Sequence, residues 1–320
     1  MNSVEQFFKN MSYKKKLEQM CSDFIRIYGE EAEKWFLDVE LLVKKSCEKW
    51  QITYLTLLPG ASLGIIISGY SEIYNKRVVV KIVPFFINRF EQELMAYKML
   101  SKKYMAKLLD YDIENKILVL ELIEPATPFV YKKEKRELAD FFKCIFQNTE
   151  IYTGDGNNNI ESYWKLYERI KMLAEKSHYL LDYREACNAR TNYIKNKYFD
   201  NIDLYYMHGD LHSGNVIKKG AKFVAIDPLG FLAPKEFIFA RFSIFELAFA
   251  KNKKEILAEL VEFLKNYISI EKFYMALIVD TDLAILTGIV QLNDGYEMTN
   301  RFVEVMIFLE MIFKKYNNFE

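Results

Sequence analysis

The spacing of apolar residues changes several times along the first part of the chain. Residues 13–49 follow the 3.6-residue period of an amphipathic helix. After Trp50 come short β-branched runs separated by turn residues, QITYLTLL, LGIIISGY and KRVVVKIVP, which predict three antiparallel strands. The stretch NRFEQELMAYKML returns to the helical period, and KILVLELIE is a further apolar strand before Pro125. These patterns predict a small sheet that carries one prominent helix.

The pattern becomes mostly helical beyond Glu124. Five segments are predicted to be helices: KRELADFFKCIF, SYWKLYERIKMLAEKSHYLL, KKEILAELVEFLKNYIS, KFYMALIVDTDLAILTGIVQL and NRFVEVMIFLEMIFKK. Two strand-like runs, DLYYMHGD and KFVAIDP, interrupt them. We therefore predict an α+β fold, with a β-rich N-terminal lobe over residues 1–124, including its leading helix, and a larger helical lobe over residues 125–320.

Composition narrows the class of protein. The chain has 320 residues, of which 51% are hydrophobic, so it can bury a substantial core. Its 44 basic and 44 acidic residues balance, which gives no overall attraction to nucleic acid or to an anionic membrane. The four cysteines are scattered without a CxxC pair, which is typical of free thiols in a reducing compartment.

No segment of the sequence has the pattern of a membrane anchor or a signal peptide. The longest apolar runs are interrupted by Asp280 and Asp282 and fall short of the roughly 18 residues that a membrane span needs. The first residues, MNSVEQFFKNMSYKKK, lack an apolar signal core. We expect a soluble cytoplasmic protein with neither a nucleic-acid nor a membrane partner, and the sequence does not indicate its oligomeric state.

The stretch YMHGDLHSGNVIKKGAKFVAIDPLG, residues 206–230, concentrates polar groups between strand-like runs. Asp210 follows such a run and a glycine, which predicts a tight turn. A hairpin beyond it would bring Asn215 and Asp227 together as two oxygen ligands, a partial shell that suits Mg²⁺ with its waters and phosphates. Asp210 beside that metal would accept a hydroxyl proton during phosphoryl transfer. A lone aspartate in a turn is usually structural, but the complete string in this context favours function.

A kinase-type site also needs a lysine on a strand and a glutamate on the next helix. Lys81 ends the run RVVVK, and Glu93 lies in FEQELMAY. Lys81 would hold the α- and β-phosphates of ATP, and Glu93 would fix Lys81 by an ion pair. Glu91 lies two residues earlier, on a different face of the helix, and is the competing partner.

Two further segments are candidates for nucleotide contacts. Gly60, Ala61 and Ser62 in the turn PGAS can present backbone N–H groups to phosphate, although Pro-Gly is also an ordinary hairpin turn. The backbone of Glu121 and Ile123, in LELIEP, is placed to pair with the adenine edge. The expected cofactors are ATP, with GTP left open, and Mg²⁺.

Together these segments resemble the aminoglycoside phosphotransferase superfamily, and within it the branch of streptomycin 6-phosphotransferases and hydroxyurea phosphotransferases. HGDLHSGN and AIDP are similar to the catalytic and metal segments of the family. PGASLGII, VVVKIVP, EQELMAY and LVLELIEP are similar to its phosphate loop, lysine strand, glutamate helix and hinge, in the same order. The late stretch LAILTGIVQLNDG is similar to its C-terminal helix and acidic turn.

The resemblance runs from about Trp50 to Gly295 and implies a protein-kinase-like, two-lobed fold. It implies that ATP and magnesium bind between a nucleotide-binding N-terminal lobe and a helical lobe that holds a small hydroxylated substrate. It also implies roles for single residues: Asp210 as the base, Asn215 and Asp227 as metal ligands, and His212 as a neighbour of the transferring phosphate.

One segment departs from the pattern of the family. Where P-x-x-F-D-x-A is expected, this chain has PKEFIFA, so that Ile238 replaces an aspartate. That aspartate would cap or brace structure near the catalytic loop. Glu236 is a candidate substitute for it.

The substrate is the least specified part of the prediction. A polycationic aminoglycoside needs carboxylates, and the candidates in the helical lobe are Asp280, Asp282, Asp294 and Glu297. For each of them taken alone, a place on a solvated face is the favoured explanation, and Asp294 is the best single candidate because it matches the acidic turn of the family. The leading hypothesis is an antibiotic-resistance kinase that phosphorylates a hydroxyl of a streptomycin-like aminoglycoside. The alternatives are a metabolic kinase for choline, a sugar or a fructosamine, and a catalytically silent nucleotide-binding module.

Overall fold

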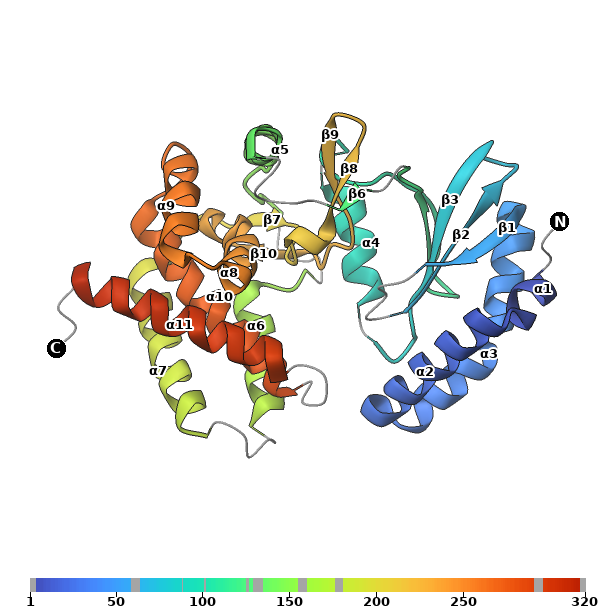
Figure 1. The fold of residues 1–320 in the computed structure, drawn as a ribbon, viewed down its shortest axis with the longest axis horizontal. Coiled ribbons are helices and arrows are strands. Elements are labelled where there is room, and N and C mark those ends of the chain that lie inside the picture. The colour runs from blue at the N-terminus through green and yellow to red at the C-terminus, as the bar shows by residue number, and fades with distance from the viewer. Residues whose placement is uncertain are drawn as a thin grey trace. The chain divides into compact units, whose positions relative to one another are not determined.

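A computed structural model gives the fold of the chain and describes residues 4–58, 64–87, 89–100, 102–124, 127–128, 135–154, 160–175, 181–290 and 296–316 (Figure 1). The chain divides into two compact units. The N-terminal unit consists of Met1–Lys98 and Ala106–Glu124, and the C-terminal unit consists of Met99–Met105 and Pro125–Glu320.

An antiparallel five-stranded sheet, in the order β1-β2-β3-β5-β4, is the centre of the N-terminal unit. Its strands are β1 (Ile52–Leu57), β2 (Ile65–Ser71), β3 (Lys76–Ile82), β4 (Leu108–Asp112) and β5 (Ile117–Glu121). The sequence predicted four of these strands. It missed β4, an edge strand of sequence LLDYD in which every residue is only half-buried, so that no apolar alternation marks it.

Helices cover both faces of this sheet. The helices of the unit are α1 (Val4–Lys9), α2 (Met11–Tyr28), α3 (Glu30–Trp50) and α4 (Phe90–Met99). The first three lie along one face, where Trp35 and Val43 join the core formed with the strands (Figure 1). The single helix predicted over residues 13–49 is in fact two helices, because the chain turns at Gly29, which has a φ of 65° that favours glycine.

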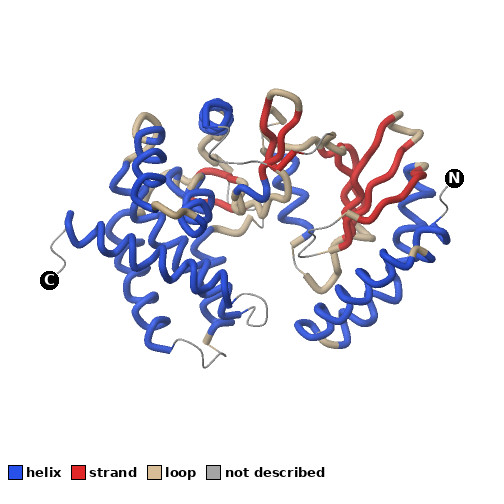
Figure 2. The backbone as a smooth tube through the Cα atoms, in the orientation of Figure 1, coloured by secondary structure: helices blue, strands red, loops and turns tan. Residues whose placement is uncertain are grey.

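The C-terminal unit is mostly helical and carries two small sheets (Figure 2). Its helices are α5 (Lys135–Gln147), α6 (Tyr163–Ala174), α7 (Leu181–Tyr198), α8 (Ala240–Phe249), α9 (Lys253–Leu264), α10 (Ile270–Val290) and α11 (Tyr296–Tyr316). One sheet has the order β6-β8-β9, with β6 (Thr127–Pro128), β8 (Val216–Lys219) and β9 (Lys222–Ala225). The other pairs β7 (Tyr205–Met207) with β10 (Phe231–Ala233), and short 3-10 helices span Ser213–Asn215 and Lys235–Ile238.

Two helices of this unit were not predicted, for opposite reasons. The sequence of α7, LDYREACNARTNYIKNKY, is too polar to show an apolar stripe, and that of α8, ARFSIFELAF, is apolar nearly all round. The α+β class itself, a small antiparallel sheet followed by a helical part, is confirmed.

Helix α10 is the centre of the C-terminal unit and packs against α6, α7, α8 and α11. Of the described helices, it alone has the length and apolar composition that would span a membrane. Its most apolar stretch is 78% buried inside the protein, as expected for a core helix. The expectation that every apolar run is too short and too interrupted for a membrane span is therefore wrong for α10, whose apolar residues are explained by burial in the core.

Candidate active site

The pleat of β3 separates Lys81 from its neighbours. Val80 and Ile82 point into the core shared with α1–α3, so Lys81 points to the opposite face of the sheet. There Lys81 Nζ donates to Glu93 Oε1 of α4 over 2.7 Å. Lys81 is 5% exposed and Glu93 is not exposed, so this is a buried ion pair. The N-terminal unit thus holds a fixed ammonium group on one face of its sheet.

The competing glutamate has a different partner. Glu91 accepts a hydrogen bond from Lys116, which precedes β5, and its side chain is more than half exposed. Glu91 and Glu93 are two residues apart and so leave the helix in different directions. The choice between them that the sequence left open is decided for Glu93.

In the C-terminal unit, a tight turn presents Asp210. Gly209 has a φ of 84°, and a Cβ at this position would lie 2.6 Å from the ring of Phe231. Only glycine fits both the backbone conformation and the close approach. The turn follows β7 directly and leaves the Asp210 side chain 26% exposed.

A hairpin brings the other two predicted residues to the same place. Val216 pairs with Ala225 in the β8–β9 register, and the ladder continues with the Ile226 amide donating to the Asn215 carbonyl over 3.0 Å. Asp227 is therefore the residue that follows the partner of Asn215 in this ladder. The Asn215 side-chain amide donates to the Asp210 carbonyl over 2.9 Å, which ties the three segments together.

The side chains fit a hard cation. Because the Asn215 amide nitrogen donates to Asp210, its oxygen points away from that bond as an acceptor. Asp227 adds a carboxylate from a left-handed backbone conformation, with a φ of 57°, a type of strain that often marks functional sites. Nowhere in the described residues do three His, Cys, Asp or Glu side chains gather as a metal cluster. One amide and one carboxylate oxygen form the kind of partial shell that Mg²⁺ uses.

His212 is held in one orientation beside Asp210. Its Nδ1 accepts a hydrogen bond from the Gly214 amide over 3.1 Å, so the proton of the neutral ring is on Nε2. That Nε2 lies 3.9 Å from Asp210 Oδ2. Burial lowers the pKa of His212, and the charge of Asp210 opposes this effect. The neutral ring is therefore favoured.

His208 is buried beneath the Asp210 turn. Its Nε2 donates to the Ile226 carbonyl over 2.9 Å, and its Nδ1 accepts from the Asp210 amide over 3.3 Å. Burial lowers the pKa of His208 to about 4, although Asp210 and the Ile226 carbonyl act in the opposite direction. The ring thus joins the Asp210 turn to the end of β9 only while it is neutral.

This lowered pKa predicts a loss of stability in mild acid. Below the ordinary histidine pKa of about 6.5, the unfolded chain binds a proton that the folded chain takes up only near pH 4. The free energy of unfolding is then expected to fall by up to roughly 3 kcal/mol across this window. Urea unfolding of the wild type and His208→Gln at a series of pH values tests this. In the variant, the free energy of unfolding should depend less steeply on pH between about 4 and 6.5 than in the wild type. An equal pH dependence in the two proteins would contradict the prediction.

The remaining nucleotide candidates are placed less fully. Gly60, Ala61 and Ser62 lie outside the described residues. The Glu121 amide donates to the Lys107 carbonyl over 2.9 Å, so this N–H group is already used and does not pair with an adenine edge. Ile123 is 3% exposed, at the end of the N-terminal unit.

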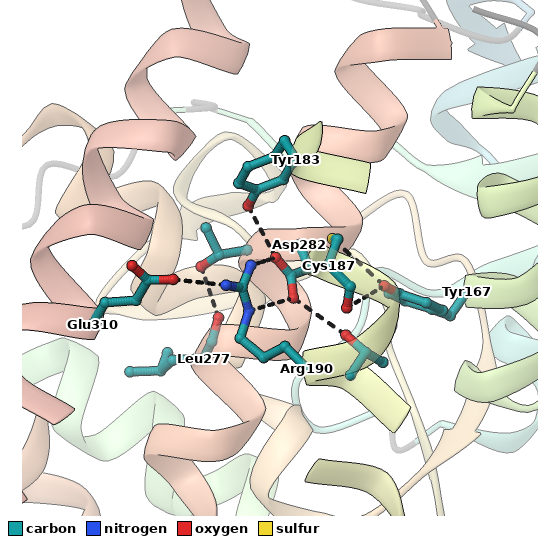
Figure 3. Close-up of polar contacts among 9 residues, drawn as sticks. Tyr167, Tyr183, Cys187, Arg190, Leu277, Asp282 and Glu310 are labelled. Carbon is teal, nitrogen blue, oxygen red and sulfur yellow. Dashed lines mark hydrogen bonds and ion pairs between the residues drawn. The ribbon is translucent and has the colours of Figure 1, made fainter. Parts of the chain in front are cut away.

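Two of the four predicted substrate carboxylates are structural. Asp282 is fully buried in α10 and accepts hydrogen bonds from Arg190, Tyr183 and Thr191 (Figure 3). Asp280 is 2% exposed, accepts from the Tyr163 hydroxyl over 3.0 Å, and lies 3.1 Å from Arg241. The structure argues against the prediction that these residues meet a substrate, because both carboxylates are buried and paired with side chains of the same unit.

Of the other two substrate candidates, only Glu297, in the first turn of α11, belongs to the part of the chain that the structure describes. Glu297 is exposed and pairs with Arg301 one turn later on the same helix. Asp294, together with the acidic turn around it, lies outside the described residues. A role of either residue in substrate binding stays a prediction.

Sequence reasoning missed three residues of α8 that lie beside the catalytic segment: Arg241, Phe245 and Glu246. The Phe245 ring stacks on His212, and Glu246 accepts a hydrogen bond from Ser213. Arg241 pairs with Asp280. The only signal in the sequence was the presence of two charged residues in an otherwise apolar segment, RFSIFELAF.

Ile238 takes the place of the expected brace. It is 5% exposed and lies in the 3-10 helix just before α8. Glu236, the proposed substitute, is 9% exposed, but the structure assigns it no bond to the catalytic segment. An apolar side chain at position 238 gives that segment no polar support.

Comparison with solved structures identifies similar folds. Choline kinase LicA from Streptococcus pneumoniae has a TM-score of 0.67 and 18% identity, over 85% of this chain and 99% of that one. A choline/ethanolamine kinase family protein from Mesorhizobium loti has a TM-score of 0.61 and 13% identity, over 84% and 94%. A thermostable mutant of aminoglycoside phosphotransferase APH(4)-Ia, in a ternary complex with ADP and hygromycin B, has a TM-score of 0.59 and 10% identity, over 83% and 97%.

No protein-family model and no curated protein matches the sequence. At identities of 10–18% the structural likeness shows the fold alone. The chain therefore has the protein-kinase-like fold that these choline kinases and this aminoglycoside phosphotransferase share, as the sequence predicted.

Proposed function

We propose that the protein is a kinase that uses ATP and Mg²⁺ to phosphorylate a hydroxyl group of a small molecule. The observation that carries this proposal is the position of Asp210, Asn215 and Asp227 around the β8–β9 hairpin, where Asn215 is hydrogen-bonded both to Asp210 and to Ile226, the residue before Asp227. The buried Lys81–Glu93 pair of the N-terminal unit supports it independently. The likeness to choline kinases and to an aminoglycoside phosphotransferase agrees with it at the level of the fold.

Each residue has a definite task in this proposal. Asp210 accepts the proton of the substrate hydroxyl as the phosphoryl group is transferred. Asn215 and Asp227 hold Mg²⁺, which neutralises charge on the phosphates when it is bound. Lys81, fixed by Glu93, holds the α- and β-phosphates. The neutral ring of His212 lies beside Asp210.

For the acceptor, we propose a streptomycin-like aminoglycoside, in line with the sequence resemblance. One observation favours a different acceptor, a small amino alcohol of the choline type. Asp280 and Asp282 are buried in ion pairs, so the helical unit has fewer carboxylates for a polycation than the sequence suggested. A choline-type acceptor carries a single positive charge and needs fewer of them.

A panel of acceptors tests the function. ADP release with Mg-ATP would be measured with streptomycin, hygromycin B, hydroxyurea, choline, ethanolamine and simple sugars, and the product identified by ³¹P NMR. Streptomycin-dependent phosphorylation would support the aminoglycoside acceptor, and choline-dependent phosphorylation the amino alcohol. Tight nucleotide binding without turnover on any acceptor would favour a catalytically silent module.

Lys81 is expected to determine the affinity for ATP. Lys81→Met should raise the dissociation constant of Mg-ATP by about 10- to 100-fold, because hydrogen bonds to charged groups contribute about 1.5–3 kcal/mol. Isothermal titration calorimetry measures this directly. Lys116→Met is the matched control, because Lys116 pairs with Glu91 of α4, the helix that also carries Glu93. This variant should change the affinity for Mg-ATP little. Equal effects of the two variants would count against the assignment.

A further inference from the structure

Helix α8 contacts the catalytic segment through an aromatic stack. The ring of Phe245 lies 4.5 Å from the ring of His212, with an angle of 10° between the planes. Offset stacking of this kind stabilises one orientation of both rings. The rings of Phe302, from α11, and Phe245 form an edge-to-face pair with their centroids 5.3 Å apart.

The His212 ring is held by the stack and by one hydrogen bond. The Gly214 amide binds His212 Nδ1 and sets one edge of the imidazole. Phe245 covers its face, so a turn about the Cβ–Cγ bond disturbs the stack, and a half-turn gives up the bond to Gly214. In this orientation Nε2 points toward Asp210, 3.9 Å from its carboxylate.

The neighbouring residue of α8 adds a second contact. Glu246 accepts a hydrogen bond from the hydroxyl of Ser213, the residue after His212. Burial raises the pKa of Glu246, and the bond from Ser213 offsets part of that effect. Adjacent residues of one helix thus hold adjacent residues of the catalytic segment.

The helix is itself tied to the core of the unit. Arg241, one turn before Phe245, pairs with Asp280 of α10 over 3.1 Å. Tyr163 donates to the same carboxylate, and its ring forms an edge-to-face pair with Phe231, against which Gly209 packs. The Asp280 carboxylate therefore binds both Tyr163, which lies under the Asp210 turn, and Arg241 of α8.

We propose that Phe245 is a positioning residue for the proposed phosphotransfer, acting through His212, and that α8 supplies the support that Ile238 does not. This inference rests on the proposed function. Phe245 itself carries no group that could exchange protons or bind a phosphate. Its effect is to keep the imidazole oriented toward Asp210.

The test compares three variants with the wild type. Phe245→Leu removes the flat ring, and kcat should fall by roughly 10- to 100-fold, because small misplacements of reacting groups cost up to about 100-fold in rate. The KM for Mg-ATP should stay within about twofold. Phe245→Tyr keeps the ring and should restore most of kcat. Phe249→Leu is the same kind of change on the same helix at a 58% exposed position and should leave kcat unchanged.

Two results would overturn the proposal. One is a Phe245→Leu variant with wild-type kcat, and the other is an equal loss of kcat in the Phe245→Leu and Phe249→Leu variants. The acceptor in these assays is the member of the panel that supports wild-type turnover.

A second measurement separates this inference from the proposed function. Proton NMR of His212, assigned by comparison with His212→Gln, reports the ring current of Phe245 without any substrate. Phe245→Leu should shift the His212 ring signals, while Phe249→Leu should not. Unchanged signals would overturn the stacking argument even if the enzyme turns over. Shifted signals in a protein without turnover would uphold the contact and refute the proposed function alone.

Discussion

Replacing Asp210 with asparagine is expected to lower kcat by about 100- to 10,000-fold, the usual contribution of a positioned acid–base group. The variant has nearly the same shape but cannot accept a proton. Gly209 and the bond from Asn215 to the Asp210 carbonyl involve only backbone atoms at this turn, so its geometry should persist. Affinity for Mg-ATP should change little, because the predicted metal and phosphate ligands are other residues. Turnover with the acceptor identified by the panel measures the first effect and calorimetry the second.

The appropriate control is an aspartate in the same stretch of chain. Asp203 is exposed, seven residues before Asp210, and Asp203→Asn should leave kcat and nucleotide affinity unchanged. Wild-type turnover in Asp210→Asn would contradict the assignment of the base. A loss of nucleotide binding equal to the loss of turnover would show that Asp210 acts on the nucleotide instead.

The sequence predicted those parts of the candidate site that are formed by residues close together in the chain. Glycine at the turn, the five-residue spacing from Asp210 to Asn215 and the hairpin to Asp227 are all encoded within a few residues of each other. The Lys81–Glu93 pair needs only the pleat of one strand and the face of the next helix. In such cases, periodicity and turn chemistry decide the geometry.

The failures concern contacts between residues far apart in sequence. Asp280 and Asp282 looked like exposed carboxylates, because their partners Arg241 and Arg190 lie 39 and 92 positions earlier in the chain. A charge on an apolar helix does not by itself reveal whether it faces water or a buried arginine. Phe245 was missed for the same reason, since a phenylalanine in an apolar helix is indistinguishable from core until its neighbour is known.

The network around Asp282 predicts the largest loss of stability. Arg190 Nη2 lies 2.5 Å from Asp282 Oδ1, and its Nε lies 3.1 Å from Oδ2, so the guanidinium binds both oxygens (Figure 3). Asp282 is not exposed at all, and its pairing with Arg190 raises the pKa of the arginine despite burial. Arg190→Met removes this partner and leaves a buried carboxylate with only neutral donors. Removing one partner of a buried ion pair costs about 3–5 kcal/mol, which is a large part of the stability of an ordinary domain.

Urea unfolding, followed by the circular dichroism of the helices, measures the loss. Glu310, the second carboxylate bound to Arg190, has a side chain that is 41% exposed, so Glu310→Gln should cost at most about 1 kcal/mol. The double variant Arg190→Met/Asp282→Leu should regain much of the loss, because it removes the unpaired charge together with its partner. If Arg190→Met cost no more than Glu310→Gln, the Asp282 carboxylate would have to reach water or another cation. Asp282 would then again be a candidate for substrate binding, which its burial argues against.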